Sequence, residues 1–174
     1  MNLRRRLSLA AALVAGAVMT VGLSGCFGEA PAASVTPSAT GFASDEEAYA
    51  AAEQTYRDFI EALNLEGEGR VGPKPEEYLT GEALDDERAG DARQEADGRH
   101  VEGRSFIAGY ESVSRTNKEI RARACEDITA TRVVDSAGND VTSPDRTTRA
   151  AYNIVYEVEG TTVLISSIRT FAQC

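Results

Sequence analysis

The stretch that decides the fold is YNIVYEVEGTTVLISSIRTF, residues 152–171. Its first half alternates large apolar residues with more polar ones, the pattern of a strand that buries one face. Glu159-Gly160 then forms a tight turn, and 161–171 is rich in β-branched residues, which favour strands. The apolar positions of the first strand are Tyr152, Ile154, Tyr156 and Val158. The stretch therefore predicts two antiparallel strands joined by a turn.

Two further β-like runs precede this pair, at about 105–116 and 120–134, and 136–140 (SAGND) is a turn cluster. Before residue 98 the pattern is helical instead. The chain therefore predicts an α+β fold in which N-terminal helices pack on one face of a curved antiparallel sheet.

The first helix is predicted to begin at Ser44-Asp45-Glu46-Glu47, a capping box. Apolar residues then recur at spacings of three and four, as on an amphipathic helix; they are Tyr49, Ala52, Tyr56, Phe59, Ile60 and Leu63. A Gly- and Pro-rich loop covers 64–75. A second helical stretch opens at Pro75, is interrupted at Thr80-Gly81, and is expected to stop at Gly98.

The chain begins with a charged and then an apolar segment. Arg4 to Arg6 are followed by an uncharged apolar run over 7–21 and by Leu23-Ser24-Gly25-Cys26, the layout of a secretory signal peptide. A permanent transmembrane helix is the alternative, but the apolar run 7–23 is at the short edge of the spanning range and contains two glycines.

Leu23, Ser24, Gly25 and Cys26 resemble the lipobox of bacterial lipoproteins at all four positions. The resemblance implies cleavage before Cys26 and a lipid (diacylglycerol, with palmitate-type chains) on its thiol. Two acyl chains are sufficient for stable membrane anchoring. The expected organisation is a signal peptide (1–25), the lipidated cysteine with a flexible tether (26–43) and one domain (44–174), on the extracytoplasmic face of the membrane.

The order of elements resembles the nuclear-transport-factor-2-like, or cystatin-like, cone. More narrowly, it is similar to actinobacterial lipoproteins of unassigned function with that fold. The likeness is carried by EAYAAAEQTYRDFIEALN (47–64), EYLTGE (77–82) and Cys125-Glu126-Asp127 with a cysteine at the end of the chain. The superfamily also contains isomerases and hydrolases that use a carboxylate inside the cone.

The charge excludes one class of partner. The 18 basic and 28 acidic residues give a net charge of −10, and the leader holds three of the basic residues and no acidic one, so the exported part carries −13. Nucleic acid repels such a chain. The expected partners are the membrane, through Cys26, and an unidentified protein or small molecule.

With Cys26 lipidated, Cys125 and Cys174 remain, and an exported domain favours a disulfide between them. Two free thiols or a metal site are the alternatives. With one histidine and no Cys-x-x-Cys motif, no metal site is expected.

No residue set predicts catalysis, and no cofactor is expected. Asp85-Asp86-Glu87 is predicted to form a solvated helix face, and His100 is predicted to lie in a linker. Glu126 and Asp127 are neighbours in a strand and point to opposite faces. Tyr152 and Tyr156 share a strand face, where they either line a pocket or belong to the core.

These features predict a membrane-anchored, non-catalytic binding or interaction module of the cell envelope. The alternative is a small-molecule enzyme of isomerase or hydrolase type, which requires an inward carboxylate at the mouth of the cone with a raised pKa.

Overall fold

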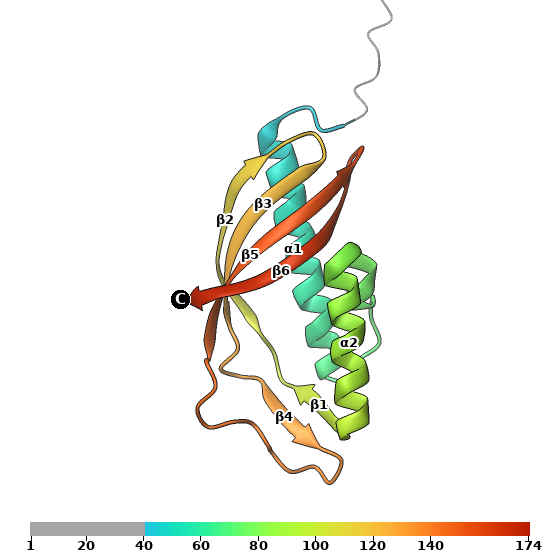
Figure 1. The fold of residues 1–174 in the computed structure, drawn as a ribbon, viewed down its shortest axis with the longest axis vertical. Helices are drawn as coiled ribbons and strands as arrows, with labels where there is room; N and C mark the ends of the chain where they lie inside the picture. Colours follow the sequence, from blue (N-terminus) through green and yellow to red (C-terminus); the bar gives the residue numbers. More distant parts are fainter. Residues whose placement is uncertain (1–40) are drawn as a thin grey trace, which may run out of the picture. The chain divides into compact units, whose positions relative to one another are not determined.

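A computed structural model describes residues 41–174, and Figure 1 shows how their helices and strands are arranged. The α+β class predicted from the sequence is confirmed, with helices first and antiparallel strands after them. The elements are α1 (Asp45–Gly67), the 3-10 helix η1 (Pro75–Tyr78), α2 (Gly81–Asp97), β1 (Arg99–Glu102), β2 (Phe106–Arg115), β3 (Glu119–Asp127), β4 (Arg132–Asp135), β5 (Arg149–Glu159) and β6 (Thr162–Gln173).

The strands form two antiparallel sheets. The larger has the order β2-β3-β5-β6, and the smaller pairs β1 with β4. The predicted hairpin at the end of the chain is confirmed, because β5 and β6 pair from Glu159 opposite Thr162 to Ala150 opposite Gln173. In residues 41–174 β2 and β6 do not pair with each other, so the large sheet is open rather than closed.

Two expectations about the strands were wrong. The run 120–134 is not continuous: β3 ends at Asp127, whose carboxylate accepts from the Thr129 backbone N–H at 3.0 Å, and this turn sends β4 into the other sheet. His100 does not lie in a linker, because it belongs to β1, where it pairs with Val134 of β4. Both errors arise because a four-residue strand is too short to show a period.

Helix α1 begins as the capping box predicts, with one difference. The Ser44 hydroxyl accepts from the Glu47 N–H at 3.1 Å, but the Glu47 carboxylate accepts from the N–H of Ala43, at 2.8 Å, rather than that of Ser44. The apolar face of α1 then covers one face of the large sheet (Figure 1). The most enclosed members of the shared core are Ala48, Ala52, Tyr56, Ile120, Ile154, Tyr156 and Ile165.

The second helical stretch is divided where the sequence is interrupted. After η1, Leu79 forms a bridge with Ile165 of β6, and α2 begins at Gly81 beside that strand. The helix ends at Asp97, and Gly98 caps it in the left-handed conformation, with φ +61°, which favours glycine.

The two edges of the large sheet differ. Leu79 and α2 lie along β6, whereas no strand among residues 41–174 pairs with the outer edge of β2. Strand β2 itself is irregular, since its register with β3 shifts between Ile107 and Gly109 and again between Ser112 and Ser114.

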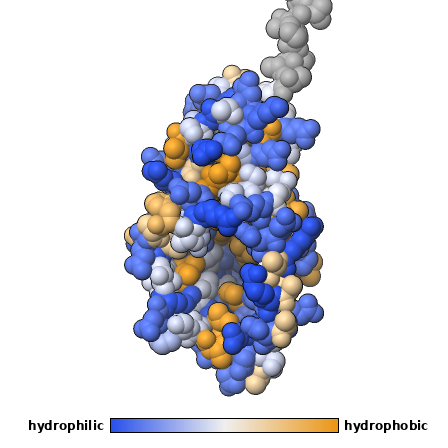
Figure 2. Space-filling view, in the orientation of Figure 1, coloured by the Kyte–Doolittle hydropathy of each residue, from blue (hydrophilic) through white to orange (hydrophobic). Residues whose placement is uncertain are grey.

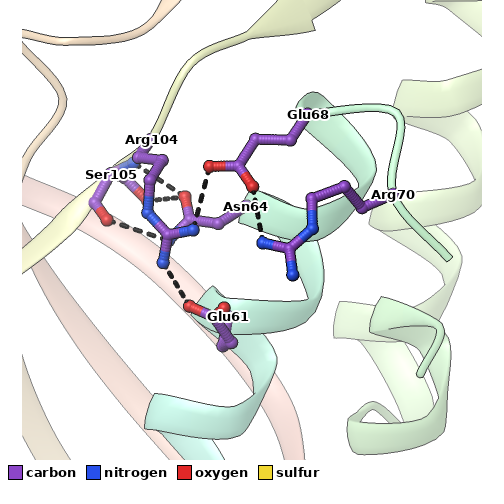
Figure 3. Close-up of polar contacts among 6 residues, drawn as sticks. All are labelled: Glu61, Asn64, Glu68, Arg70, Arg104 and Ser105. Carbon is purple, nitrogen blue, oxygen red and sulfur yellow. Dashed lines mark hydrogen bonds and ion pairs between the residues drawn. The ribbon is translucent and has the colours of Figure 1, made fainter. Parts of the chain in front are cut away.

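A polar network holds the connection between β1 and β2 to the end of α1 (Figure 3). Asn64 is 5% exposed, accepts from the Ser105 N–H at 2.8 Å and donates to the Ser105 carbonyl at 3.0 Å. Around it Arg104 bonds Glu68 at 2.9 Å and Glu61 at 2.5 Å, both near the surface. The buried amide therefore satisfies the backbone where the chain passes from the small sheet to the large one.

We expect Asn64→Ala to lower the free energy of unfolding by roughly 2–3 kcal/mol, because it leaves two backbone groups of Ser105 without partners. Urea unfolding followed by circular dichroism measures the change. Arg104→Ala is the control and should cost clearly less, because its ion pairs are solvent-screened. Equal losses in the two variants would contradict this account.

Candidate functional site

In the part of the chain that the structure describes, a single carboxylate is buried, and it lies on the inner face of the large sheet. Along β3 the residues that point toward α1 are Ile120, Ala122, Ala124 and then Glu126, which is 8% exposed. The Tyr56 hydroxyl of α1 donates to Glu126 Oε1. Asp127, its neighbour, lies on the other face, as the sequence predicts, and is partly exposed. The inward position of Glu126 was not identified from the sequence, although the alternation that ends in it is the signal that places it there.

Tyr56 and Tyr152 lie near this carboxylate, and Tyr110 and Tyr156 lie farther along the same buried face. Tyr156 is fully enclosed and its hydroxyl lies 3.0 Å from that of Tyr110, so it belongs to the core. Tyr152 is half-buried and lines a cleft. Burial raises the pKa of Tyr56 and of Tyr156, and it raises that of Tyr110 to about 12. These hydroxyls are therefore neutral hydrogen-bonding groups at physiological pH.

Glu126 forms part of the wall of a cleft of about 250 Å³ between α1, α2 and one end of the large sheet. Figure 2 shows a hollow near the middle of the face viewed, with polar and apolar side chains around it. The cleft is lined by Phe59, Ile60 and Leu63 of α1, by Ala83, Asp86 and Glu87 of α2, and by Glu126, Tyr152 and Ile168 of the sheet.

The second carboxylate of this cleft corrects an expectation. Asp85, Asp86 and Glu87 were expected to form one solvated face, but only Asp85 and Asp86 are exposed, while Glu87 is half-buried. Burial raises the pKa of Glu87 to about 7, and the nearby Asp91 and other carboxylates add to the shift. The turn of α2 toward the cleft places Glu87 on a different face from Asp85.

One carboxylate oxygen of Glu126 makes no hydrogen bond among residues 41–174. Burial raises its pKa, and the hydrogen bond from Tyr56 opposes that shift. Among residues 41–174 no hydrogen bond engages Glu126 Oε2, and no fully enclosed polar side-chain atom lacks a partner. Glu126 Oε2 is therefore accessible from the cleft.

We expect the protein to become less stable as pH rises from about 4.5 to 7. In this range Glu87 is protonated in the folded state and ionised in the unfolded state, so folding takes up protons and each rise in pH opposes it. Glu126 acts in the same direction. Urea unfolding at several pH values measures the slope.

Glu87→Gln and Glu126→Gln should each flatten this slope, and the exposed Asp85→Asn should leave it unchanged. A stability that rises with pH between 4.5 and 7, or a slope unaffected by both Gln variants, would contradict the assignment.

Two larger hollows are lined by no buried acid among residues 41–174. One, of about 440 Å³, lies by the β2–β3 and β5–β6 turns; its Arg115 is held by the Ser44 carbonyl and Asp45, and its Lys118 is exposed. The other, of about 380 Å³, lies in the exposed loop over 66–74. Neither is lined by a buried carboxylate such as Glu126 of the smaller cleft.

The structure joins Cys125 to Cys174 by a disulfide, with their Cα atoms 5.9 Å apart. Leu23, Ser24, Gly25 and Cys26 lie outside the described residues, so the leader, the lipid and the tether remain predictions. His100 is exposed and bonds Glu102 at 3.1 Å. In residues 41–174 no group of three or more His, Cys, Asp or Glu side chains could hold a metal ion.

Residues 41–174 form an α+β domain with one large open sheet and two main helices. Within 41–174, no helix has both the length and the apolar character needed to cross a membrane.

No family model matches the chain, and no curated protein matches it. Among solved structures, the intermembrane space region of the chloroplast protein ARC6 is similar, with 16% identity and a TM-score of 0.41. That match covers 69% of this chain and 96% of the other.

Proposed function

We propose that this chain is an extracytoplasmic binding module, anchored by lipid on Cys26, whose cleft takes a small molecule. The observation that carries the proposal is a nine-tenths-buried carboxylate, Glu126, with one oxygen open to a cleft lined mainly by apolar side chains. Apolar walls with a few placed polar groups are typical of small-molecule sites. The lipobox and the leader support the location, and the order of elements supports kinship with the nuclear-transport-factor-2-like lipoproteins.

The size of the cleft limits the ligand. At about 250 Å³ it is smaller than the roughly 300–1,000 Å³ of pockets that hold drug-sized molecules. The expected ligand is therefore small, with an apolar body that reaches the walls and one polar group that reaches Glu126.

The test is a binding screen with a chemically diverse set of small fragments on the full chain in mild detergent, read by two-dimensional NMR. Binding should perturb the amide signals of Glu126, Tyr152 and Ile168 together. Ala83→Leu adds bulk to a residue that lines the cleft and should weaken binding about tenfold or more, whereas Ala89→Leu, exposed on the same helix, should not. A binding role for the cleft would be refuted if the fragments that bind perturb only signals outside the cleft, or if Ala83→Leu does not change their affinity.

An enzymatic role is the second candidate, and the raised pKa of Glu126 beside the Tyr56 hydroxyl favours it. A carboxylate whose pKa is shifted toward neutrality is suited to general acid–base catalysis. Its signature would be exchange of an α-carbon proton of a bound carbonyl fragment with D₂O. Glu126→Gln would abolish that exchange while keeping the fragment bound. If the unmodified protein shows no exchange, the enzymatic role is excluded and only the binding role remains.

A further inference from the structure

The charges around the cleft indicate what kind of molecule it holds. Its ionisable wall residues include three carboxylates, Asp86, Glu87 and Glu126, and no Lys, Arg or His. We propose that the cleft binds a small organic cation, an ammonium or amidinium group on an apolar body; this rests on the cleft being the binding site.

Glu126 is the group that the cation would contact. One oxygen accepts from Tyr56, while Oε2 has no partner among residues 41–174 and is open to the cleft. A buried carboxylate is costly unless it is paired. An ammonium group that donates an N–H to Oε2 supplies a hydrogen bond and a positive charge. No described residue of the protein supplies either to this oxygen.

The opposite wall adds a second unpaired carboxylate, because Glu87 forms no ion pair among residues 41–174. Glu87 is half-buried and faces repulsion from Asp91 of α2, Glu66 of α1 and Glu76 of η1. Arg169 pairs with Glu82 and, at 3.1 Å, with Asp86, so it offsets the charge of Asp86 rather than that of Glu87. A bound cation would relieve the repulsion at Glu87, and a bound anion would increase it.

The remaining walls suit the body of such a ligand. Phe59 and Tyr152 supply aromatic rings, and Leu63 and Ile168 supply aliphatic surface. A cation near an aromatic ring gains a further attraction. The combination of buried acid, half-buried acid and aromatic walls distinguishes a cation site from an ordinary solvated acidic surface.

The test compares three probes with one apolar body and different charges: benzylamine, benzyl alcohol and benzoate. They are titrated into the full chain in mild detergent at pH 7.5 and followed by NMR at the cleft signals. We expect benzylamine to bind about ten- to a hundredfold more tightly than benzyl alcohol, as for a charge-assisted hydrogen bond, and benzoate not to bind.

Variants locate the source of the preference. Glu126→Gln should reduce the preference for benzylamine over benzyl alcohol about tenfold, and Glu87→Gln should reduce it less. Asp85→Asn removes the same charge from α2 outside the cleft and should leave the preference unchanged.

Equal binding of benzyl alcohol and benzylamine at the cleft would overturn the cation proposal and leave the cleft as a binding site. So would a preference that Asp85→Asn reduces as much as Glu126→Gln, because that preference would come from net charge. If no probe perturbs the cleft, the cation proposal fails for this body, and the fragment screen decides separately whether the cleft binds anything.

Discussion

The Gly103→Ala variant is expected to lose on the order of 4 kcal/mol of unfolding free energy, a large share of the 5–15 kcal/mol that a domain usually has. Gly103 connects β1 to β2 and has φ +92°, a conformation that costs other residues roughly 1–2 kcal/mol. A Cβ at this position would also lie 2.1 Å from the backbone carbonyl oxygen of Ala130. Because that neighbour is backbone, the two connections between the sheets would have to move apart.

Gly138→Ala separates the two effects. Gly138 has a similar φ, +83°, but a Cβ there would meet no atom within 4 Å, so this variant should lose only about 1–2 kcal/mol. Urea unfolding of both variants measures the difference. Similar losses in the two proteins would show that the connections near Gly103 and Ala130 are not packed as described.

Loss of the Cys125–Cys174 disulfide is expected to lower the unfolding free energy by about 4 kcal/mol. The bond closes a loop across a sequence separation of 49 residues, and constraining the unfolded chain over that length accounts for a stabilisation of this size. In the folded state Cys125 lies opposite Ala151 of β5, and Ala151 lies opposite Ala172 of β6. The bond from Cys174 therefore links β3 to the end of β6 across β5.

The measurement is urea unfolding with and without a thiol reductant, beside the double variant Cys125→Ala/Cys174→Ala. The reductant should destabilise the unmodified protein and have no effect on the double variant. If the reductant does not change the unfolding midpoint of the unmodified protein, the disulfide is contradicted.

The sequence predicted the elements that are long and periodic. The amphipathic α1, the β5–β6 hairpin and the stop at Gly98 all followed from local rules of spacing and capping. The four-residue strands β1 and β4 were not separated from their surroundings, because their pairing depends on a partner 30 or more residues away.

The candidate site could be predicted only in part from the sequence, for a related reason. Alternation along β3 indicates that Glu126 and Asp127 face opposite sides, but which side is buried depends on where α1 packs. Similarly, Glu87 lies in an acidic run, and only the packing of α2 beside β6 turns it toward the cleft. Tertiary contacts rather than local sequence therefore decide which acids are buried.

The two irregularities in β2 have a consequence for self-association. An open strand edge can add another chain's strand, which is how aggregation begins, and bulges make an edge a poor template by disturbing its hydrogen-bonding spacing. In β2 the register shifts at 107–109 and 112–114 leave no long regular run. Among residues 41–174, the edge of the large sheet that no strand pairs with is thus protected against fibril growth by its own backbone geometry.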